Sequence, residues 1–321
     1  MKIEVTRDVF PLAQVFRISR GARTEAEVLT VTLSDGDHVG RGECVPYARY
    51  DETLASVEAE IAALPHDITR KGLQDLMEPG AARNALDCAL WDLESKKAGK
   101  RVWELAGLPA PKPEVTAYTL SLDEPAAMQA QAEKHAWRPL LKIKLGTPDD
   151  MPRLEAVRRG APTSKIIIDA NEGWSPEVYA DLSPHLLRLG VALVEQPLPA
   201  GLDEGLIGMD RPVPVCADES CHDRHSLPGL KGKYDVVNIK LDKTGGLTEA
   251  LELRRAALAE GYDVMVGCMV GSSLAMAPAV LLAQGAMVTD LDGPLLLASD
   301  RACPLQYDDA GVHPSDRALW G

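Results

Sequence analysis

Five charged residues are spaced along the second half of the chain in a way that could support acid–base chemistry at a metal ion. Each ends a short apolar run, as in IIID, LVE, VCAD and VNIK, and intervals of roughly 25 residues suit successive strand–helix units. An isolated acid after such a run is more often a helix N-cap or turn residue. Five charged residues on consecutive units are hard to explain as caps, and these are Lys144, Asp169, Glu195, Asp218 and Lys240.

The three acids in this series predict a magnesium site. Three carboxylates on neighbouring strands offer only hard oxygen ligands, which Mg²⁺ prefers, with waters or substrate oxygens completing its octahedron. No histidine ends one of these runs, which disfavours zinc. The two lysines flank the three acids in chain order, so a substrate on the metal would have an amine on each face. Two opposed bases at a Lewis acid indicate reversible proton transfer at a carbon α to a carboxylate.

A second lysine accompanies Lys144 in the stretch LLKIKLG, residues 140–146. Lys142 and Lys144 are two residues apart, so on a strand they point to the same face. An edge strand with one solvated face would also explain this pattern. If the strand is interior, we expect Lys142 to hold the substrate carboxylate. Lys144 must be neutral to act as a base near pH 7, and we expect Lys142 and the metal to lower its pKa.

Eight short β-rich runs alternate with helical stretches after residue 112. Repeated strand–helix units predict a parallel sheet, and eight of them predict an α/β fold of the closed (β/α)₈ barrel type. Catalytic side chains of such barrels lie at the carboxyl ends of the strands, where the five charged residues are expected. The runs are TAYTLSL, LLKIKL, KIIIDAN, ALVEQP, VPVCADES, DVVNIKLD, DVMVGCM and MVTDLDG.

The first part of the chain, to about residue 110, has an α+β pattern. EVLTVTLSDGDHVGRGECVP predicts two strands joined by a turn at residues 34–37. Two helical stretches follow, ETLASVEAEIAAL and ARNALDCALWDLESKKAGK, and the second is expected to end near Gly99. The proline-rich stretch LPAPKPEV after them predicts a linker.

Composition narrows the classes of partner. The chain has 321 residues and a net charge of −14, which disfavours nucleic acid and anionic membranes as partners. The start, MKIEVTRDVF, has no apolar signal core, and no apolar run is long enough for a membrane span. The six cysteines form no C-x-x-C pair, so we expect reduced thiols and a cytoplasmic protein.

Motifs along nearly the whole chain resemble those of the enolase superfamily. The K-x-K, Asp, Glu, Asp and Lys series resembles its muconate-lactonizing subgroup and, within that subgroup, the dipeptide epimerases. This resemblance implies a modified (β/α)₇β barrel in residues 113–300 and an α+β capping domain in residues 1–112. It also implies that residues 301–321 return to the capping domain, which would close over the barrel mouth. The stretches that carry the resemblance are GECVPYARY, GAARNALDCALWDL, LVEQPLPA, CADESCH, VNIKLDKTGGLTEAL and DLDGP.

The same resemblance implies a reaction. Lys144 and Lys240 would invert the α-carbon of the C-terminal residue of an L-Ala-Glu-type dipeptide, through a metal-stabilised enolate. One Mg²⁺ per subunit, replaceable by Mn²⁺, would be held by the three acids of the series. Lys142 would contact the substrate carboxylate. Such an isomerase would serve murein peptide metabolism.

Further substrate contacts follow from the resemblance. Asp290 and Asp292 match a D-x-D that receives the ammonium group of the dipeptide, although the sequence Asp-Gly-Pro at residues 292–294 would by itself predict a turn. Arg23 in SRGARTEA matches an arginine of a mobile capping loop that contacts the glutamate side chain. The other implied contacts are Thr119, Cys268 and Met269. The stretch GCMVGSS departs from the family's sequence pattern after Met269.

Other functions are left open by the sequence. A cycloisomerase, an o-succinylbenzoate-type synthase or an N-acylamino-acid racemase of the same subgroup needs no ammonium receptor, so the D-x-D argues against them. A mandelate-type racemase or a sugar-acid dehydratase would place a histidine where this chain has Gly-Cys-Met at residues 267–269. A non-catalytic binding protein would not need two matched lysines. A homo-oligomer is compatible with the sequence.

Overall fold

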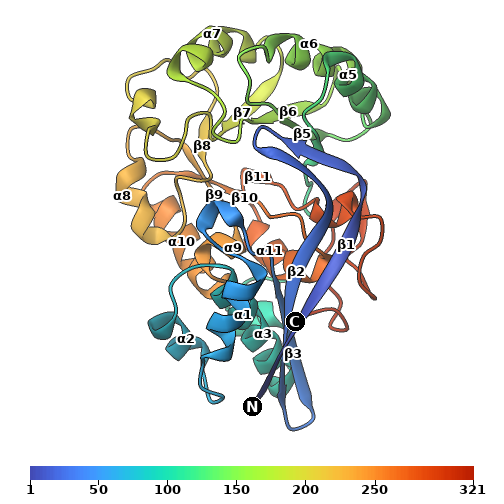
Figure 1. Ribbon diagram of the computed structural model, residues 1–321, viewed down its shortest axis with the longest axis vertical. Coiled ribbons are helices and arrows are strands. Elements are labelled where there is room, and N and C mark those ends of the chain that lie inside the picture. The colour runs from blue at the N-terminus through green and yellow to red at the C-terminus, as the bar shows by residue number, and fades with distance from the viewer.

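The computed structural model describes residues 1–321 and begins with a three-stranded antiparallel sheet. Its strands are β1 (Lys2–Ile18), β2 (Gly21–Asp35) and β3 (His38–Cys44), in the order β1-β2-β3. The predicted turn at residues 34–37 is confirmed, because Asp35 pairs with His38 across the β2–β3 hairpin. The β1–β2 hairpin is long, and Figure 1 shows its tip reaching the strands of the second part of the molecule.

Four helices complete this first part: α1 (Leu54–Ala62), α2 (Arg70–Leu76), α3 (Ala81–Ala98) and α4 (Val102–Leu105). The two predicted helices correspond to α1 and α3, and α3 ends at Gly99 with a left-handed φ of 66°. Helix α2 was not predicted. Strand β3 lies very close to α3, since a Cβ at Gly42 would be 2.1 Å from the carbonyl oxygen of Ala85.

Eight parallel strands form the second part, and each of the eight predicted runs overlaps one of them. They are hydrogen-bonded in chain order, and a parallel bridge between Thr116 and Thr289 joins the first strand region to the last. The barrel-type α/β fold is therefore confirmed. The strands are β4 (Tyr118–Leu120), β5 (Leu140–Lys144), β6 (Lys165–Asp169), β7 (Val191–Glu195), β8 (Val215–Ala217), β9 (Val236–Ile239), β10 (Asp263–Val266) and β11 (Val288–Thr289).

Helices connect most of these strands on the outside of the barrel (Figure 1). Between β7 and β8 the only helical element is the short 3₁₀ turn η2 (Asp203–Leu206), so one expected helix is missing. Three further 3₁₀ turns are η1 (Ala48–Tyr50), η3 (Arg224–Ser226) and η4 (Gly293–Leu296). The α-helices are α5 (Pro125–Lys134), α6 (Met151–Gly160), α7 (Pro176–Leu186), α8 (Leu227–Leu230), α9 (Leu241–Thr244), α10 (Leu247–Ala259) and α11 (Ser273–Ala283).

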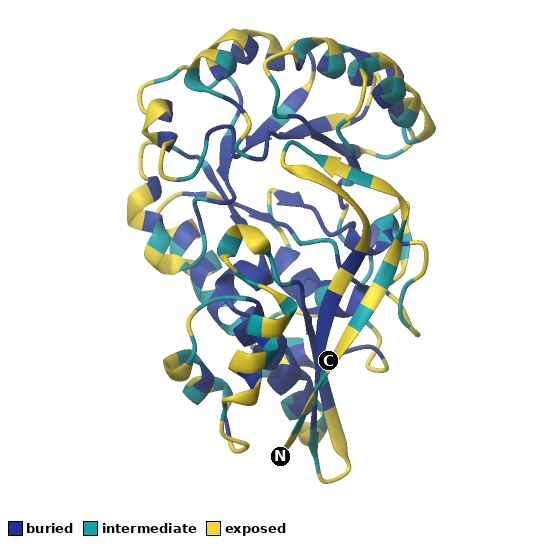
Figure 2. Cartoon of the chain, in the orientation of Figure 1, coloured by how far each residue is buried: buried dark blue, intermediate teal, exposed yellow.

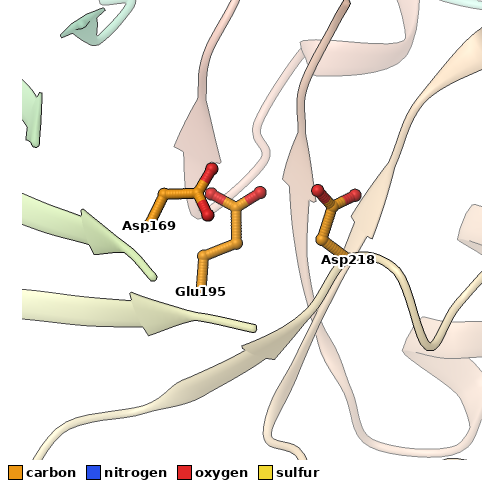
Figure 3. Close-up of side chains that lie close together, drawn as sticks. All are labelled: Asp169, Glu195 and Asp218. Atoms are coloured by element: carbon orange, nitrogen blue, oxygen red, sulfur yellow. The ribbon is translucent and has the colours of Figure 1, made fainter. Parts of the chain in front are cut away.

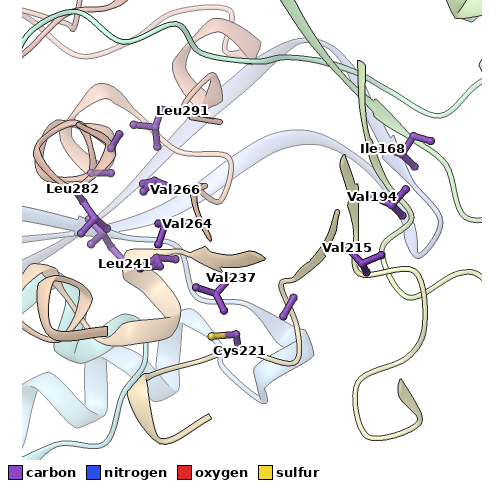
Figure 4. Close-up of a cluster of buried hydrophobic side chains, with 14 of the residues drawn as sticks. Ile168, Val194, Val215, Cys221, Val237, Leu241, Val264, Val266, Leu282 and Leu291 are labelled. Atoms are coloured by element: carbon purple, nitrogen blue, oxygen red, sulfur yellow. The ribbon is translucent and has the colours of Figure 1, made fainter. Parts of the chain in front are cut away.

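Two layers of apolar side chains hold the barrel together. The outer layer lies between strands and helices, as Figure 4 shows for Val264 and Val266 against Leu282 of α11, and Figure 2 shows the buried strands inside exposed helix surfaces. The inner layer takes one residue from each strand region and fills the barrel interior. Its members are Ala117, Leu140, Ile167, Leu193, Cys216, Val236, Met265 and Val288.

The last residues of the chain pack against the first part. A small hairpin of β12 (Tyr307–Asp308) and β13 (Gly311–Val312) precedes them. The Trp320 indole donates a hydrogen bond to the carbonyl oxygen of Cys88 at 3.0 Å, and the backbone N–H of Gly321 donates to Asp92 at 2.8 Å. The domain boundaries expected near residues 112 and 300 stay a prediction. None of the helices is both long and apolar enough to cross a bilayer.

Candidate active site

The period-two geometry of the strands places the charged residues above the inner apolar layer. Side chains two residues apart on a strand point to the same face. Lys142 and Lys144 follow Leu140 at this spacing, Asp169 follows Ile167, and the other charged residues follow their own inner-layer members in the same way. The edge-strand alternative for residues 140–146 is therefore wrong, because β5 lies between β4 and β6 and is buried throughout.

Asp169, Glu195 and Asp218 converge as expected. One carboxylate oxygen from each lies within 4.8 Å of the others, all three residues are buried, and Figure 3 shows the side chains projecting from neighbouring strand ends toward one another. Three buried carboxylates at this separation repel one another unless cations balance them. Burial and the carboxylate of Asp169 raise the pKa of Glu195 to about 8. A hard divalent cation fits this all-oxygen donor set.

The lysines balance these acids with short ion pairs. The Nζ of Lys144 lies 2.6 Å from Oδ2 of Asp169, and the Nζ of Lys240 lies 2.6 Å from Oδ2 of Asp218. Burial disfavours the charged form of Lys240, but Asp218 and Glu195 outweigh it and raise the pKa of Lys240 well above its usual value. The same carboxylates that would hold a metal ion therefore form an ion pair with Lys240.

Lys142 is more deeply buried than either flanking lysine. Its Nζ lies 2.6 Å from Glu195, 2.7 Å from Asp290 and 3.0 Å from Asp169. Burial opposes its charge, yet Asp169 and its other acidic neighbours raise the pKa of Lys142 well above its usual value. Lys142 thus links the predicted metal cluster to the D-x-D motif.

Three further residues hold the acids in place, and none of them was predicted from the sequence. Lys243 of α9 is fully buried and its Nζ lies 2.6 Å from Oδ1 of Asp218. Asn238 lies two residues before Lys240 on β9 and donates to Glu195 at 2.7 Å. The side-chain oxygen of Gln196 accepts the backbone N–H of Asp218 at 2.8 Å.

Asp290 and Asp292 are buried on the far side of Lys142. The Oδ2 of Asp290 accepts a hydrogen bond from Lys142, while its Oδ1 is buried and has no hydrogen-bond partner. The Oδ2 of Asp292 accepts the backbone N–H of Thr119 at 2.6 Å. Burial and the charge of Asp290 raise the pKa of Asp292 to about 7. The pair is therefore short of positive charge.

A cavity of about 450 Å³ opens between the first part of the molecule and the barrel. Lys144, Asp218 and Lys240 line it, together with Cys268 and Met269 of the loop after β10. Thr119 lines a smaller pocket of about 90 Å³, and the other predicted site residues, apart from Arg23, line neither space. The two lysines Lys144 and Lys240 thus open onto one space large enough for a small molecule.

Arg23 lines the same cavity from the β1–β2 hairpin. It belongs to β2, where it pairs with Phe16, rather than to a loop between strands as expected. Its guanidinium carbon lies 5.5 Å from the centre of the Tyr47 ring. Arg20, which was not predicted as a site residue, also lines this cavity and donates a hydrogen bond to the backbone carbonyl of Asn171 at 2.8 Å.

The chain matches two family models along most of its length. Residues 1–107 match the mandelate racemase/muconate lactonizing enzyme N-terminal domain, and residues 126–315 match the enolase C-terminal domain-like family.

Individual proteins are similar over nearly the whole chain. An L-Ala-D/L-Glu epimerase from Escherichia coli is 44% identical, over 97% of this chain and 99% of that protein. An N-acetyl-D-glutamate racemase from a Pseudoalteromonas species is 48% identical, over 92% of this chain and 95% of that protein. A crystal structure from Agrobacterium tumefaciens has a TM-score of 0.97 and 52% identity and covers 99% of both chains. It is described as an enolase family member with homology to dipeptide epimerases, with bound sodium, L-Ala-L-Glu and an ordered loop.

Proposed function

Because the chain belongs to the mandelate racemase/muconate lactonizing enzyme family, we propose that it is a dipeptide epimerase acting on L-Ala-Glu. One observation carries the proposal. Two lysines from strand ends on either side of three buried carboxylates line the same cavity. Strands β6, β7 and β8 separate the strand of Lys144 from the strand end that bears Lys240, so the two amines approach that space from different sides.

The three acids and the two lysines have different roles in the proposed reaction. Asp169, Glu195 and Asp218 would hold one Mg²⁺, which when bound supplies Lewis-acid stabilisation of negative charge on the substrate carboxylate. One lysine, in its neutral form, removes the α-proton from one face of the substrate. The other, in its protonated form, delivers a proton to the opposite face, and reversing the roles serves the other epimer.

Residues around the lysines select the substrate. We assign the α-ammonium of the dipeptide to Asp290 and Asp292, whose shortage of positive charge an ammonium would relieve. We assign the side-chain carboxylate of glutamate to Arg23, since a guanidinium can bond a carboxylate at two points. Lys142 would assist the α-carboxylate, and Cys268 and Met269 would contact the peptide.

A second candidate is racemisation of N-acetylglutamate, which the similarity to the Pseudoalteromonas protein favours. In N-acetylglutamate an acetyl group stands where the dipeptide has its alanyl residue, so the amide bond is kept and the ammonium group is absent. The two buried carboxylates of the D-x-D motif would then lack the ammonium as a partner, which costs about 1–3 kcal/mol.

The two functions are separated by comparing L-Ala-L-Glu with N-acetyl-L-glutamate under identical Mg²⁺ conditions. Chiral separation of the products gives kcat/KM for each. We expect the dipeptide to be favoured at least roughly tenfold. Equal turnover, or faster turnover of N-acetylglutamate, would instead support the racemase.

A further inference from the structure

Two loops of the first part of the molecule are tied to one acidic residue on the barrel rim. Arg20, at the tip of the β1–β2 hairpin, donates from Nη1 to Oε2 of Glu172 at 3.0 Å. Arg49, in the η1 turn, donates to both oxygens of Glu172, at 2.9 Å each. Glu172 therefore accepts charged hydrogen bonds from two segments that are separate in sequence.

The position of the Glu172 side chain is fixed by its surroundings. Its side chain is only 8% exposed, and its Oε1 also accepts the backbone N–H of Ala200 at 2.8 Å. Asn171 and Glu172 have left-handed φ values of 45° and 65°, a conformation that persists in non-glycine residues only when neighbouring contacts impose it. Asn171 donates its backbone N–H to Asp169 at 2.9 Å, so the segment that bears Glu172 is hydrogen-bonded to a predicted metal ligand.

Arg20 also contacts two residues that line the cavity, Glu219 and Tyr47. Its Nη2 lies 2.7 Å from Oε1 of Glu219, the residue after Asp218, and donates to the hydroxyl of Tyr47 at 3.0 Å. The ring of Tyr47 in turn lies under the guanidinium of Arg23. The position of the arginine assigned to the glutamate side chain is thus set through Tyr47 and Arg20.

We infer that Glu172 is a positioning residue that locks both loops over the barrel mouth and so sets the affinity for the substrate. The inference deepens the proposed function and rests on it for the identity of the substrate. When a binding-competent state is only fractionally populated, the apparent dissociation constant rises by the inverse of that fraction. Loss of the lock should therefore raise KM, whereas the lysines and the three metal-facing acids keep their own contacts.

The test is Glu172→Gln, which keeps the shape of the side chain and removes its charge. We expect KM for L-Ala-L-Glu to rise roughly tenfold or more while kcat stays within about threefold of wild type, because closure is weakened and the reacting groups are unchanged. The matched control is Arg7→Gln, since Arg7 and Glu58 form a similar two-point ion pair that does not reach the barrel. The control should leave KM unchanged. A fall in kcat with unchanged KM in Glu172→Gln would overturn the inference.

Hydrogen exchange of the backbone amides tests the lock without a substrate. Residues 19–23 and 47–50 should exchange faster in Glu172→Gln than in wild type or Arg7→Gln. Unchanged protection of both loops would contradict the lock, whatever the substrate proves to be. Absence of dipeptide turnover in wild type, by contrast, would contradict only the proposed function. If Glu172→Gln does not fold, Arg49→Gln removes the more exposed partner and should show the same changes in KM and exchange.

Discussion

At the scale of single residues, the site is a balanced set of buried charges. Lys142 has three carboxylate partners, while Lys144 and Lys240 each have one close partner. A buried ion pair is costly to disrupt, because removing one partner leaves the other charge unpaired in a poorly solvating environment. Substitutions in this set therefore affect folding as well as chemistry. Residues at its edge, such as Arg23, allow a cleaner test of substrate recognition.

Arg23→Ala should impair turnover of dipeptides with an acidic C-terminal residue. The loss of a charged hydrogen bond to the glutamate side chain predicts a roughly tenfold to hundredfold fall in kcat/KM for L-Ala-L-Glu. L-Ala-L-Ala and L-Ala-L-Met should lose little, because they carry no second carboxylate. Steady-state kinetics on the three dipeptides give the comparison. A variant that slows all three equally would show that Arg23 acts in loop closure or folding.

Asp292→Asn should reduce the preference for a substrate with a free ammonium group over N-acetyl-L-glutamate. An ammonium against two carboxylates is a charge-assisted contact, and replacing one carboxylate by an amide weakens it. We expect kcat/KM for L-Ala-L-Glu to fall by roughly tenfold. The value for N-acetyl-L-glutamate should change much less, so the ratio of the two is the measurement. An unchanged ratio would remove Asp292 from the ammonium site.

At the scale of elements, the alternation of strands made much of the barrel predictable. Short β-rich runs alternating with helical stretches located all eight strands, and the same period of two, counted back from Lys240, would have found Asn238. Lys243 could not be found in this way, because it lies on the one-turn helix α9 and folds back onto Asp218. Gln196 likewise takes a left-handed φ of 36° just after β7, outside the strand pattern.

Contacts between segments that are distant in the sequence could not be predicted either. The pairing of Arg20 with Glu172 and Glu219 depends on how the hairpin lies over the barrel, which no local pattern encodes. The stretch between β7 and β8 has a length that suits a helix, yet it forms only a 3₁₀ turn.

Close packing of β3 on α3 gives a prediction at this scale. In Gly42→Ala the new methyl group would meet the backbone carbonyl of Ala85, which cannot move without shifting the helix. Overpacking of this kind costs about 1–3 kcal/mol or more, so the free energy of unfolding in urea should fall by that amount. Gly229→Ala is the control, because a Cβ there meets nothing within 4 Å. Equal stability of the two variants would mean that β3 is not held as tightly as described.

At the scale of the whole molecule, charged contacts tie the first part, the barrel and the C-terminal segment together. Buried Glu43, near the end of β3, lies 2.7 Å from Arg301 and accepts the backbone N–H of Ser272 at 2.8 Å. Ser272 lies two residues after the cavity-lining Val270, so this contact connects the sheet to the mouth. The protein carries a net charge of −14, so its overall field does not attract a dianionic substrate. Binding of such a substrate therefore depends on local cations.

Metal binding should stabilise the whole fold. A ligand that binds only the folded state at one hundred times its dissociation constant adds about 2.7 kcal/mol of stability. We expect Mg²⁺, and Mn²⁺ in its place, to raise the melting temperature of wild type and to be required for turnover. Asp169→Asn should reduce both the thermal shift and the activity, because a hard cation prefers a charged oxygen. Full activity after treatment with a chelator would contradict the metal assignment.

The central claim is that Lys144 and Lys240 act as separate bases on opposite faces of one substrate carbon. The most direct test follows the α-proton of L-Ala-L-Glu and of L-Ala-D-Glu by ¹H NMR in D₂O with Mg²⁺, for wild type, Lys144→Ala and Lys240→Ala. Wild type should convert either epimer into the same deuterated mixture. Each single variant should fail to interconvert the epimers, and any remaining exchange should occur with one epimer only, a different one for each variant. A single variant that interconverts the epimers at close to the wild-type rate would contradict the two-base account.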